Sequence, residues 1–203
     1  MKKNKISKNW INRQKRDIYV RQSKLEGYRS RAVYKLQEIQ EKFNVIKNGS
    51  SVIDLGAAPG SWSEYVSRKF KNAKIVSIDL KEIVPINNVF SIKGDFNDEK
   101  NQKTISDYFN SQADLVMSDM AVNTTGNKNL DSMVTGELSL EAMFFSTKVL
   151  KKNGSFVSKI FMGSSFNEII EKAKKLFKEV NIYKPPASRK DSKENFIICK
   201  FIR

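Results

Sequence analysis

The stretch "SVIDLGAAPGSW", residues 51–62, joins a short apolar run to a turn of small residues. Five residues that are mostly apolar and end near an acid are typical of a buried strand, and a turn containing glycine and proline is typical of the passage from such a strand into a helix. Further strand-like runs alternate with helix-like segments along the chain. This alternation indicates an α/β protein with a mostly parallel, doubly wound sheet covered by helices.

The turn lacks the features of a phosphate cradle. Gly56 is followed by Ala57, Ala58 and Pro59, so the middle glycine of the dinucleotide fingerprint G-x-G-x-x-G is missing, and no Lys-Ser or Lys-Thr follows Gly60 as in a P-loop. A carboxylate at Asp54 repels phosphate but suits a cationic or hydroxyl-rich ligand. The turn fits a positively charged nucleoside such as S-adenosylmethionine, and an ordinary strand-to-helix turn is the alternative.

Further elements follow the same pattern, beginning with an amphipathic helix from Ser30 that Asn48-Gly49 closes. The expected helices after the turn are 61–70, 98–110, 135–150 and 167–177, and the expected strands are 51–55, 74–80, 89–92, 113–118, 154–161, 180–183 and 195–202. Residues 121–133 are expected to be a polar loop. The last two strands are joined without a helix, so one strand near the C-terminus is expected to run antiparallel.

Composition limits the classes of protein. The chain of 203 residues suits one domain, expected at 28–203 and preceded by a basic arm at 1–27. We expect a cytoplasmic protein with no membrane partner, because no apolar run is long enough to span a bilayer and the N-terminus lacks the apolar segment of a signal peptide. A monomer is the default expectation.

The residue types available also limit the chemistry. The chain has no histidine and a single cysteine, Cys199, so we expect no metal site and no internal disulfide. Cys199 lies in the apolar pattern "FIICKFI" and is expected to pack within a strand. Any general base must be a lysine, an acid or a tyrosine.

The net charge of +15 is concentrated at the two ends of the chain. Residues 1–35 hold 12 Lys/Arg and 2 Asp/Glu, residues 171–203 hold 10 and 4, and residues 36–170 hold 15 and 16. Charge runs are often no more than solvated faces. A neutral central part between basic ends nevertheless favours a protein that binds a polyanion such as RNA.

Four acids follow strand-like runs, namely Asp54, Asp79, Asp95 and Asp119. Ligands of doubly wound sheets bind at the carboxyl ends of the strands, so these acids are candidate ligand contacts. Asp79 lies 23 residues after Gly56, near the spacing at which an acid binds ribose hydroxyls, and Asp95 is suited to accept a hydrogen bond from an adenine amino group.

The turn adds further candidate contacts for the cofactor. We include Gly56, Gly60 and Ser61 with the acids, and Asp54 remains among them. Trp62, at the start of the following helix, either walls the pocket or packs in the core.

The surroundings of this site restrict the group that could be methylated. Methylation of an adenine amine typically uses an Asn/Asp-Pro-Pro-aromatic turn, but this chain has "SDMAVN" at that place. Covalent methylation of a pyrimidine carbon needs a cysteine nucleophile, and Cys199 lies in an apolar strand segment that does not suit this role. A ribose hydroxyl is left as the candidate acceptor. It is a poor nucleophile and needs a base.

Lys159, in "VSKIF", lies among apolar residues of a predicted strand, where burial or a nearby cation would favour its proton-accepting form. Lys35 is the candidate neighbouring cation, and Asp119 and Glu194 are candidates to orient the pair. Taken singly, each of these residues is better explained by a structural role, Lys35 on a solvated helix face, Lys159 on an edge strand and Glu194 in a surface loop.

Six segments of the sequence, taken together, favour a functional role for these residues over a structural one. The segments "RSRAVYKLQEI", "VIDLGAAPGSWSEY", "GDF", "SDMAVNTTG", "VSKIF" and "SRKDSKENFI" resemble, in order and approximate spacing, those of the FtsJ family of ribosomal RNA large-subunit methyltransferases. The resemblance extends from Tyr28 to Phe201.

The resemblance implies a Rossmann-like fold that uses S-adenosylmethionine. It also implies a Lys-Asp-Lys-Glu tetrad at Lys35, Asp119, Lys159 and Glu194, with Lys159 accepting the proton. Cofactor contacts are implied at Gly60, Trp62, Asp79, Asp95 and Asp119. The implied reaction is methylation of the 2′-hydroxyl of a uridine in the A loop of 23S ribosomal RNA, within the large (50S) ribosomal subunit.

Two positions depart from the family pattern. Ser61 replaces a glycine that usually follows "AAPG", and we expect its hydroxyl to lie beside the cofactor and to tighten the turn. Val122 replaces the proline of "DMAPN", so we expect a less rigid loop. A transfer RNA 2′-O-methyltransferase and a largely non-catalytic ribosome-assembly factor remain the alternatives.

Overall fold

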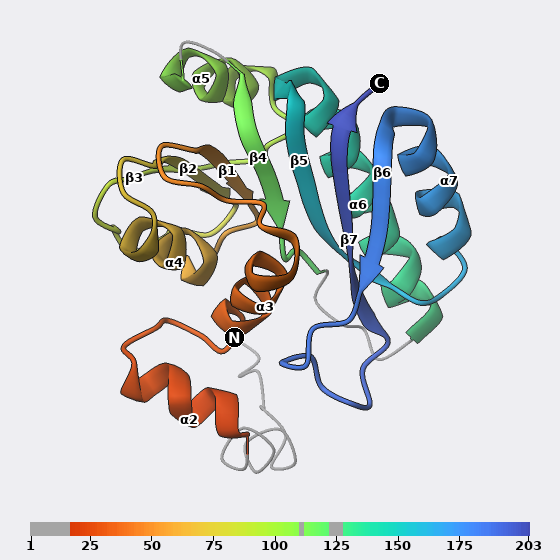
Figure 1. The fold of residues 1–203 in the computed structure, drawn as a ribbon, viewed down its shortest axis with the longest axis horizontal. Coiled ribbons are helices and arrows are strands. Elements are labelled where there is room, and N and C mark those ends of the chain that lie inside the picture. Colours follow the sequence, from red (N-terminus) through yellow and green to blue (C-terminus); the bar gives the residue numbers. More distant parts are fainter. Residues whose placement is uncertain (1–16, 110–111, 122–127) are drawn as a thin grey trace, which may run out of the picture.

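A seven-stranded sheet runs through the structure, a computed structural model that describes residues 17–109, 112–121 and 128–203 (Figure 1). The strands are β1 (Ser51–Leu55), β2 (Lys74–Asp79), β3 (Val89–Lys93), β4 (Ala113–Ser118), β5 (Leu150–Phe161), β6 (Phe177–Tyr183) and β7 (Glu194–Ile202). Their spatial order is β3-β2-β1-β4-β5-β7-β6. The order reverses beside β1, which is where doubly wound sheets bind ligands.

The strands pair mostly in parallel. Parallel ladders join β3 to β2, β2 to β1, β1 to β4 and β4 to β5. Strand β7 lies between β5 and β6 and is antiparallel to both, and within the described residues β6 hydrogen-bonds to β7 alone. The expected doubly wound sheet with one antiparallel strand near the C-terminus is therefore confirmed.

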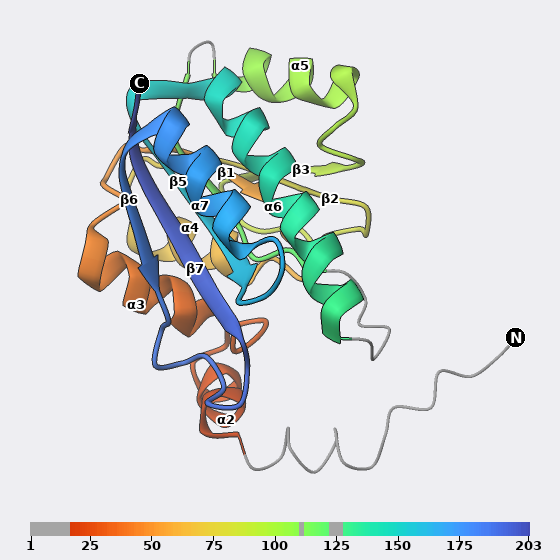
Figure 2. The same ribbon diagram turned by 90° about the vertical axis from the view of Figure 1, so that its right-hand side faces the viewer.

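Helices cover both faces of the sheet (Figure 2). They are α2 (Ile18–Leu25), α3 (Val33–Phe43), α4 (Ser61–Lys69), α5 (Glu99–Phe109), α6 (Lys128–Val149) and α7 (Phe166–Leu176). Helices α3 and α4 pack on one face, and α5, α6 and α7 pack on the other. Each face has its own apolar core, because side chains of successive strand residues point to opposite faces.

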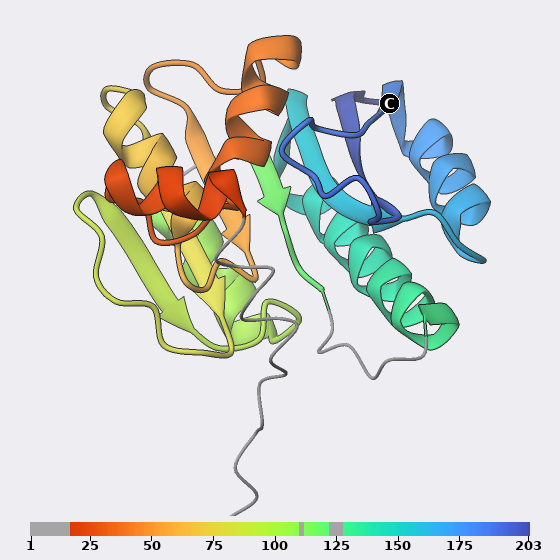
Figure 3. The same ribbon diagram turned by 90° about the horizontal axis from the view of Figure 1, so that it is seen from below.

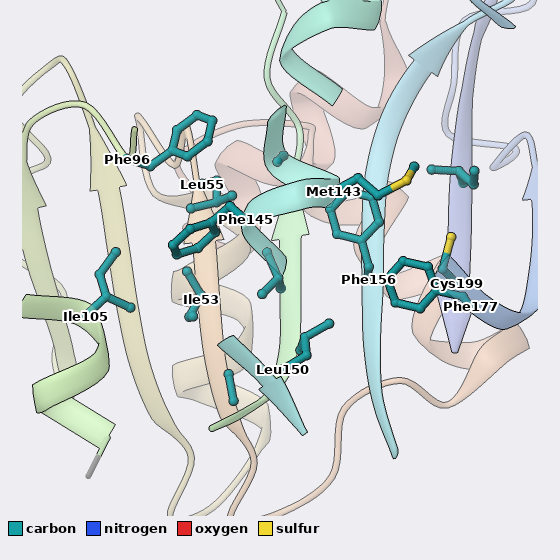
Figure 4. Packing of buried hydrophobic residues seen from close by; sticks show 14 of the residues in the cluster. Ile53, Leu55, Phe96, Ile105, Met143, Phe145, Leu150, Phe156, Phe177 and Cys199 are labelled. Carbon is teal, nitrogen blue, oxygen red and sulfur yellow. The ribbon is translucent and has the colours of Figure 1, made fainter. Parts of the chain in front are cut away.

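The core beneath α5, α6 and α7 is rich in aromatic and branched side chains (Figure 4). Phe156 of β5 stacks on Phe177 of β6, with ring centroids 6.3 Å apart, and Cys199 of β7 packs in the same cluster. Cys199 is a buried free thiol, as expected for a residue that packs within a strand. Burial raises the pKa of this thiol, so it remains protonated.

Helix α3 buries an apolar stripe that includes Val33, Leu36 and Ile39. It ends earlier than the sequence suggests, because Asn44 adopts the left-handed conformation and its N–H bonds to the carbonyl of Gln40. The expectation that Asn48-Gly49 closes the helix is therefore wrong. Gly49 lies instead in the turn that leads into β1, where its N–H donates to the carbonyl of Lys71.

Boundaries also differ around β5. Helix α6 begins at Lys128, so the polar loop expected over residues 121–133 is helical from residue 128. Strand β5 begins at Leu150, because this side chain is buried in the core and its backbone pairs with Ala113. The register shift between Ala113 and Leu115 accommodates this early start.

The segment expected to be a basic arm is helical where it is described. Residues Ile18–Leu25 form α2, which begins at the N-cap Asp17. Tyr19 contacts Tyr34 of α3 with ring centroids 5.3 Å apart, and Ser23 is buried. Residues 1–16 lie outside the described part of the chain.

The described residues contain neither a membrane-spanning helix nor a metal-binding cluster. None of these helices is both long and apolar enough to cross a bilayer. No cluster of three or more cysteine or acidic side chains with the geometry of a metal site occurs within the same ranges.

Candidate functional site

The carboxyl ends of the parallel strands meet on the side of the molecule that Figure 3 shows. The turn after β1 begins with Gly56, whose φ of 64° is costly for any residue with a side chain. A Cβ at Gly56 would lie 2.0 Å from the Cγ atom of Met120, in the segment after β4. Glycine is therefore required both by the turn and by the close approach of this neighbouring segment.

Gly60 ends the turn as the N-cap residue of α4, with a φ of 99°. Its two successors contact protein groups rather than open space. The Ser61 hydroxyl lies 2.7 Å from the hydroxyl of Ser30, and the indole N–H of Trp62 donates to the carbonyl of Ala32 over 2.8 Å. Trp62 is 3% exposed. Both side chains thereby attach α4 to the segment that precedes α3.

Asp54 is 2% exposed at the end of β1. Its Oδ2 atom accepts hydrogen bonds from the backbone N–H of Ser63 at 3.1 Å and from the Ser63 hydroxyl at 2.7 Å. Burial raises the pKa of Asp54 to about 7, and the negative charges of Asp119 and Asp79 add to this effect. The site thus holds a carboxyl group that changes charge near neutral pH.

Asp79 is the last residue of β2, and Asp95 lies shortly after the end of β3. The carboxylate of Asp79 accepts from the N–H of Ala58 at 2.9 Å and from the N–H of Lys81 at 2.7 Å. It therefore links the turn after β1 to the turn after β2. Asp95 is exposed, and its carboxylate accepts from the N–H of Asn97 at 2.9 Å.

A pocket of about 720 Å³ lies between these turns. Acidic and glycine residues from the strand ends line it, together with apolar and amide side chains: Gly56, Ala58, Ile78, Asp79, Leu80, Lys81, Gly94, Asp95, Phe96, Asn97, Asp119, Met120, Ala121, Leu138 and Glu141. This volume is in the range of small-molecule sites, roughly 300–1,000 Å³. The excess of carboxylates favours a ligand that carries positive charge or several hydroxyl groups.

A smaller cavity of about 40 Å³ lies next to this pocket. Gly56, Ala58 and Asp119 border both spaces, and Asp54, Ser61 and Trp62 border only the smaller one. The sequence predicted five of these six residues as parts of the site. Ala58 was expected only as part of the turn.

Asp119 also belongs to a cluster with two lysines and Glu194. Lys159 Nζ lies 3.0 Å from Asp119 Oδ1 and donates to the Asp119 carbonyl over 2.5 Å. Lys35 Nζ lies 3.5 Å from both Asp119 carboxylate oxygens and 2.8 Å from Glu194 Oε2. The structure thus brings together four residues that are far apart in the sequence.

The charges in this cluster are strongly coupled. Burial alone would raise the pKa of Asp119, but the ammonium groups of Lys159 and Lys35 hold it below its usual value. Burial alone would lower the pKa of Lys35, but the carboxylates of Asp119 and Glu194 raise it. Lys35 and Asp119 are therefore held in their charged forms.

Some residues of the site carry no signal in the sequence. The Ser188 hydroxyl donates to Glu194 Oε1 over 2.8 Å, and Glu141 of α6 lines the larger pocket. Arg29 donates to the carbonyl of Pro59 and to those of Val84 and Pro85, which joins the loops after β1 and β2. Arg29 stands within the recognised segment "RSRAVYKLQEI", but nothing in its spacing indicated these contacts. Val122, where the family proline was missing, lies outside the described residues.

An acidic pocket lies beside β1, where the strand order reverses, and next to the ion-paired Lys35 and Lys159. Together with β7 inserted between β5 and β6, this arrangement is that of a Rossmann-like methyltransferase. Comparison with known families makes this class more specific. The chain belongs to the FtsJ-like methyltransferase family, whose model matches residues 28–201.

Individual relatives agree with this assignment. The chain is 64% identical over its full length, and over the full length of the relative, to ribosomal RNA large subunit methyltransferase E of Pelagibacter ubique strain HTCC1062. It is 43% identical to the protein of the same name from Zymomonas mobilis, over 97% of this chain and 89% of that one. A crystal structure described as a ribosomal RNA methyltransferase from Plasmodium falciparum superposes with a TM-score of 0.75 at 30% identity, covering 86% of this chain and 98% of that chain.

Proposed function

We propose that the protein transfers a methyl group from S-adenosylmethionine to the ribose 2′-hydroxyl of a uridine in the A loop of 23S ribosomal RNA, within the large ribosomal subunit. The observation that carries the proposal is the position of Asp119. Its side chain borders the acidic pocket and also forms ion pairs with Lys159 and Lys35. A ligand in the pocket would therefore lie next to the lysine that we assign as the proton acceptor.

The pocket suits the proposed cofactor chemically. Asp79 and Asp95 both line the pocket. Asp79 is suited to bind ribose hydroxyls, and Asp95 is suited to accept a hydrogen bond from an adenine amino group. Asp54 and Asp119 border the small cavity next to the pocket, where they favour a sulfonium or ammonium group. When bound, S-adenosylmethionine supplies a methyl carbon on a sulfonium, which a nucleophilic oxygen can displace.

The residues of the cluster then have distinct proposed tasks. The O–CH₃ bond forms as the S–CH₃ bond breaks, and the 2′-hydroxyl proton passes to Lys159 Nζ, which must first lose a proton to solvent and become a neutral amine. Lys35 is a weaker candidate for this step because two carboxylates hold it as an ammonium, and Asp119 is a weak base because its pKa is lowered. Glu194 and Asp119 fix the positions of the two lysine side chains. Most of the expected rate gain comes from alignment and proton removal.

The names of the relatives and the charge distribution support ribosomal RNA as the acceptor. Both curated relatives are named for the large ribosomal subunit, and the basic ends of this chain suit a polyanion. On this proposal the protein acts as a monomer in the cytoplasm, where ribosomal subunits assemble, and needs no metal. Residues 28–203 form the methyltransferase domain.

The test uses S-adenosylmethionine labelled in the methyl group and three acceptors: large subunits that lack the modification, naked ribosomal RNA, and transfer RNA. We expect label in the subunits, mapped to a single ribose of a uridine in the A loop. Labelled transfer RNA would instead support a transfer RNA 2′-O-methyltransferase. Tight binding of subunits without any label would support a ribosome-assembly factor.

A substitution at Gly56 tests the cofactor pocket. Alanine at this position is expected to weaken the binding of S-adenosylmethionine at least about tenfold, because the new methyl group displaces Met120 from the pocket wall. Backbone strain at a positive φ is expected to cost about 1–3 kcal/mol of stability in addition. Isothermal calorimetry and thermal denaturation measure the two effects.

Gly49→Ala is the matched control for this experiment. Gly49 also has a positive φ, of 78°, but an added Cβ has no heavy atom within 4 Å. We expect Gly49→Ala to lose a similar amount of stability and to bind the cofactor normally. Equal binding by both variants would contradict the placement of the cofactor beside Gly56.

A further inference from the structure

A series of contacts leads from the start of α2 to the lysine cluster. Asp17, the N-cap of α2, lies outside the segment 28–201 that matches the family model. Glu194, which binds Lys35, lies at the other end of the series. The segment that joins them is the loop of residues 184–193, between β6 and β7.

The first contacts gather at the carboxylate of Asp17, whose side chain is 9% exposed. Its Oδ1 accepts from the N–H of Tyr19 at 3.1 Å, which caps α2. Its Oδ2 forms an ion pair with Arg31 and lies 3.6 Å from Nε of Arg189, within the loop. One carboxylate therefore joins α2, the segment before α3 and the loop.

Arg31 and α3 fix the loop itself. Arg31 donates from its second guanidinium nitrogen to the carbonyl of Ala187, and the N–H of Ala187 donates to the Glu38 carboxylate of α3 over 2.8 Å. Both backbone groups of Ala187 are thus bound from outside the loop. Ala187 is fully buried, so its position is closely defined.

The last contact reaches Glu194 through Ser188, the residue after Ala187. The Ser188 hydroxyl donates to Glu194 Oε1 over 2.8 Å, and the other carboxylate oxygen accepts from Lys35 over 2.8 Å. Ser188 is 5% exposed and Glu194 is 8% exposed, so water cannot easily replace this hydrogen bond. A shift of the loop would therefore rotate or release the carboxylate that holds Lys35.

We propose that Asp17 is a positioning residue for methyl transfer, because it fixes the 184–193 loop and thereby the orientation of Glu194 through Ser188. The proposal rests on the proposed function. It extends the catalytic unit to a helix that precedes the family-matched segment. Asp17 touches neither pocket, so it acts through Arg31 and the loop.

Asp17→Asn isolates the ionic link, because asparagine is as good an N-cap as aspartate and preserves α2. We expect kcat to fall about tenfold or more, with the KM for S-adenosylmethionine within about twofold of the wild type. We also expect faster amide hydrogen exchange in peptides that cover residues 184–193. Asp107→Asn is the control for loss of one charge, since Asp107 is exposed and pairs only with Lys103 within the described residues.

Ser188→Ala removes the last contact in the series. A double-mutant cycle with Asp17→Asn is expected to be non-additive, the double variant being little slower than the slower single variant. Additive losses would overturn the proposal, as would an unchanged kcat in Asp17→Asn. Unchanged exchange of the loop in that variant would overturn it too. The exchange measurement does not depend on activity, so it tests the link between Asp17 and the loop by itself. Failure of the wild type to methylate ribosomal RNA would count against the proposed function and not against this link.

Discussion

Methyl transfer is expected to fall by about 10²–10⁴-fold when Lys159 is replaced by alanine, the usual contribution of a general base. Binding of S-adenosylmethionine should stay within a few-fold of the wild type, because Lys159 does not line the acidic pocket. Single-turnover methylation of unmodified subunits measures the first effect, and calorimetry measures the second.

Two further variants separate the loss of the base from a general disturbance. Lys159→Met keeps an unbranched side chain among the apolar neighbours of β5 and is expected to be as inactive as the alanine variant. Lys151→Ala removes a lysine from the opposite end of the same strand, where it pairs with Asp114 at 2.7 Å, and is expected to remain active. Methylation by Lys159→Met at the wild-type rate would exclude Lys159 as the proton acceptor.

Asp54→Asn is expected to change stability and ligand affinity in opposite directions. The side chain is buried, and its pKa is raised to about 7 by burial. Between about pH 4 and pH 7 the unfolded chain therefore loses the Asp54 proton while the folded protein retains it, so stability falls as the pH rises through this window. Asparagine stays neutral and avoids this loss.

The variant should consequently be more stable than the wild type at pH 8, by up to a few kcal/mol in order of magnitude, and should differ much less at pH 4. Binding of S-adenosylmethionine at pH 8 should weaken, because a carboxylate near its cationic groups is lost. Thermal denaturation and calorimetry at both pH values measure these effects. A variant that is less stable at pH 8 and binds normally would contradict both the charge assignment and the position of the cationic groups.

Local patterns in the sequence predict most of the fold. Alternating apolar runs and amphipathic segments give the parallel strands, and β1 and β4 have the expected bounds. The missing helix between the last two strands predicts the antiparallel β7. The early start of α6 could not be predicted, because residues 128–133 are mostly polar and their two apolar residues do not establish the apolar period of a surface helix.

Some residues of the candidate site could likewise be predicted from the sequence, and others could not. Acids at the carboxyl ends of strands are brought to one edge by the parallel sheet, which is why Asp54, Asp79 and Asp119 could be grouped from sequence. Ser188 and Asp17 could not, because their contacts depend on the path of an irregular loop and on packing between distant segments. Such contacts leave no periodic pattern in the chain.

The order of strands has a consequence for how the protein is made on the ribosome. Strand β6 is synthesised before β7, yet β7 lies between β6 and the rest of the sheet. Until β7 has emerged, β5 and β6 each present an unpaired edge, and Glu194 has not yet reached Lys35. The growing chain therefore acquires a closed sheet and a complete lysine cluster in the same late step, so a nascent chain interrupted before β7 is both prone to aggregate and without the carboxylate that holds Lys35.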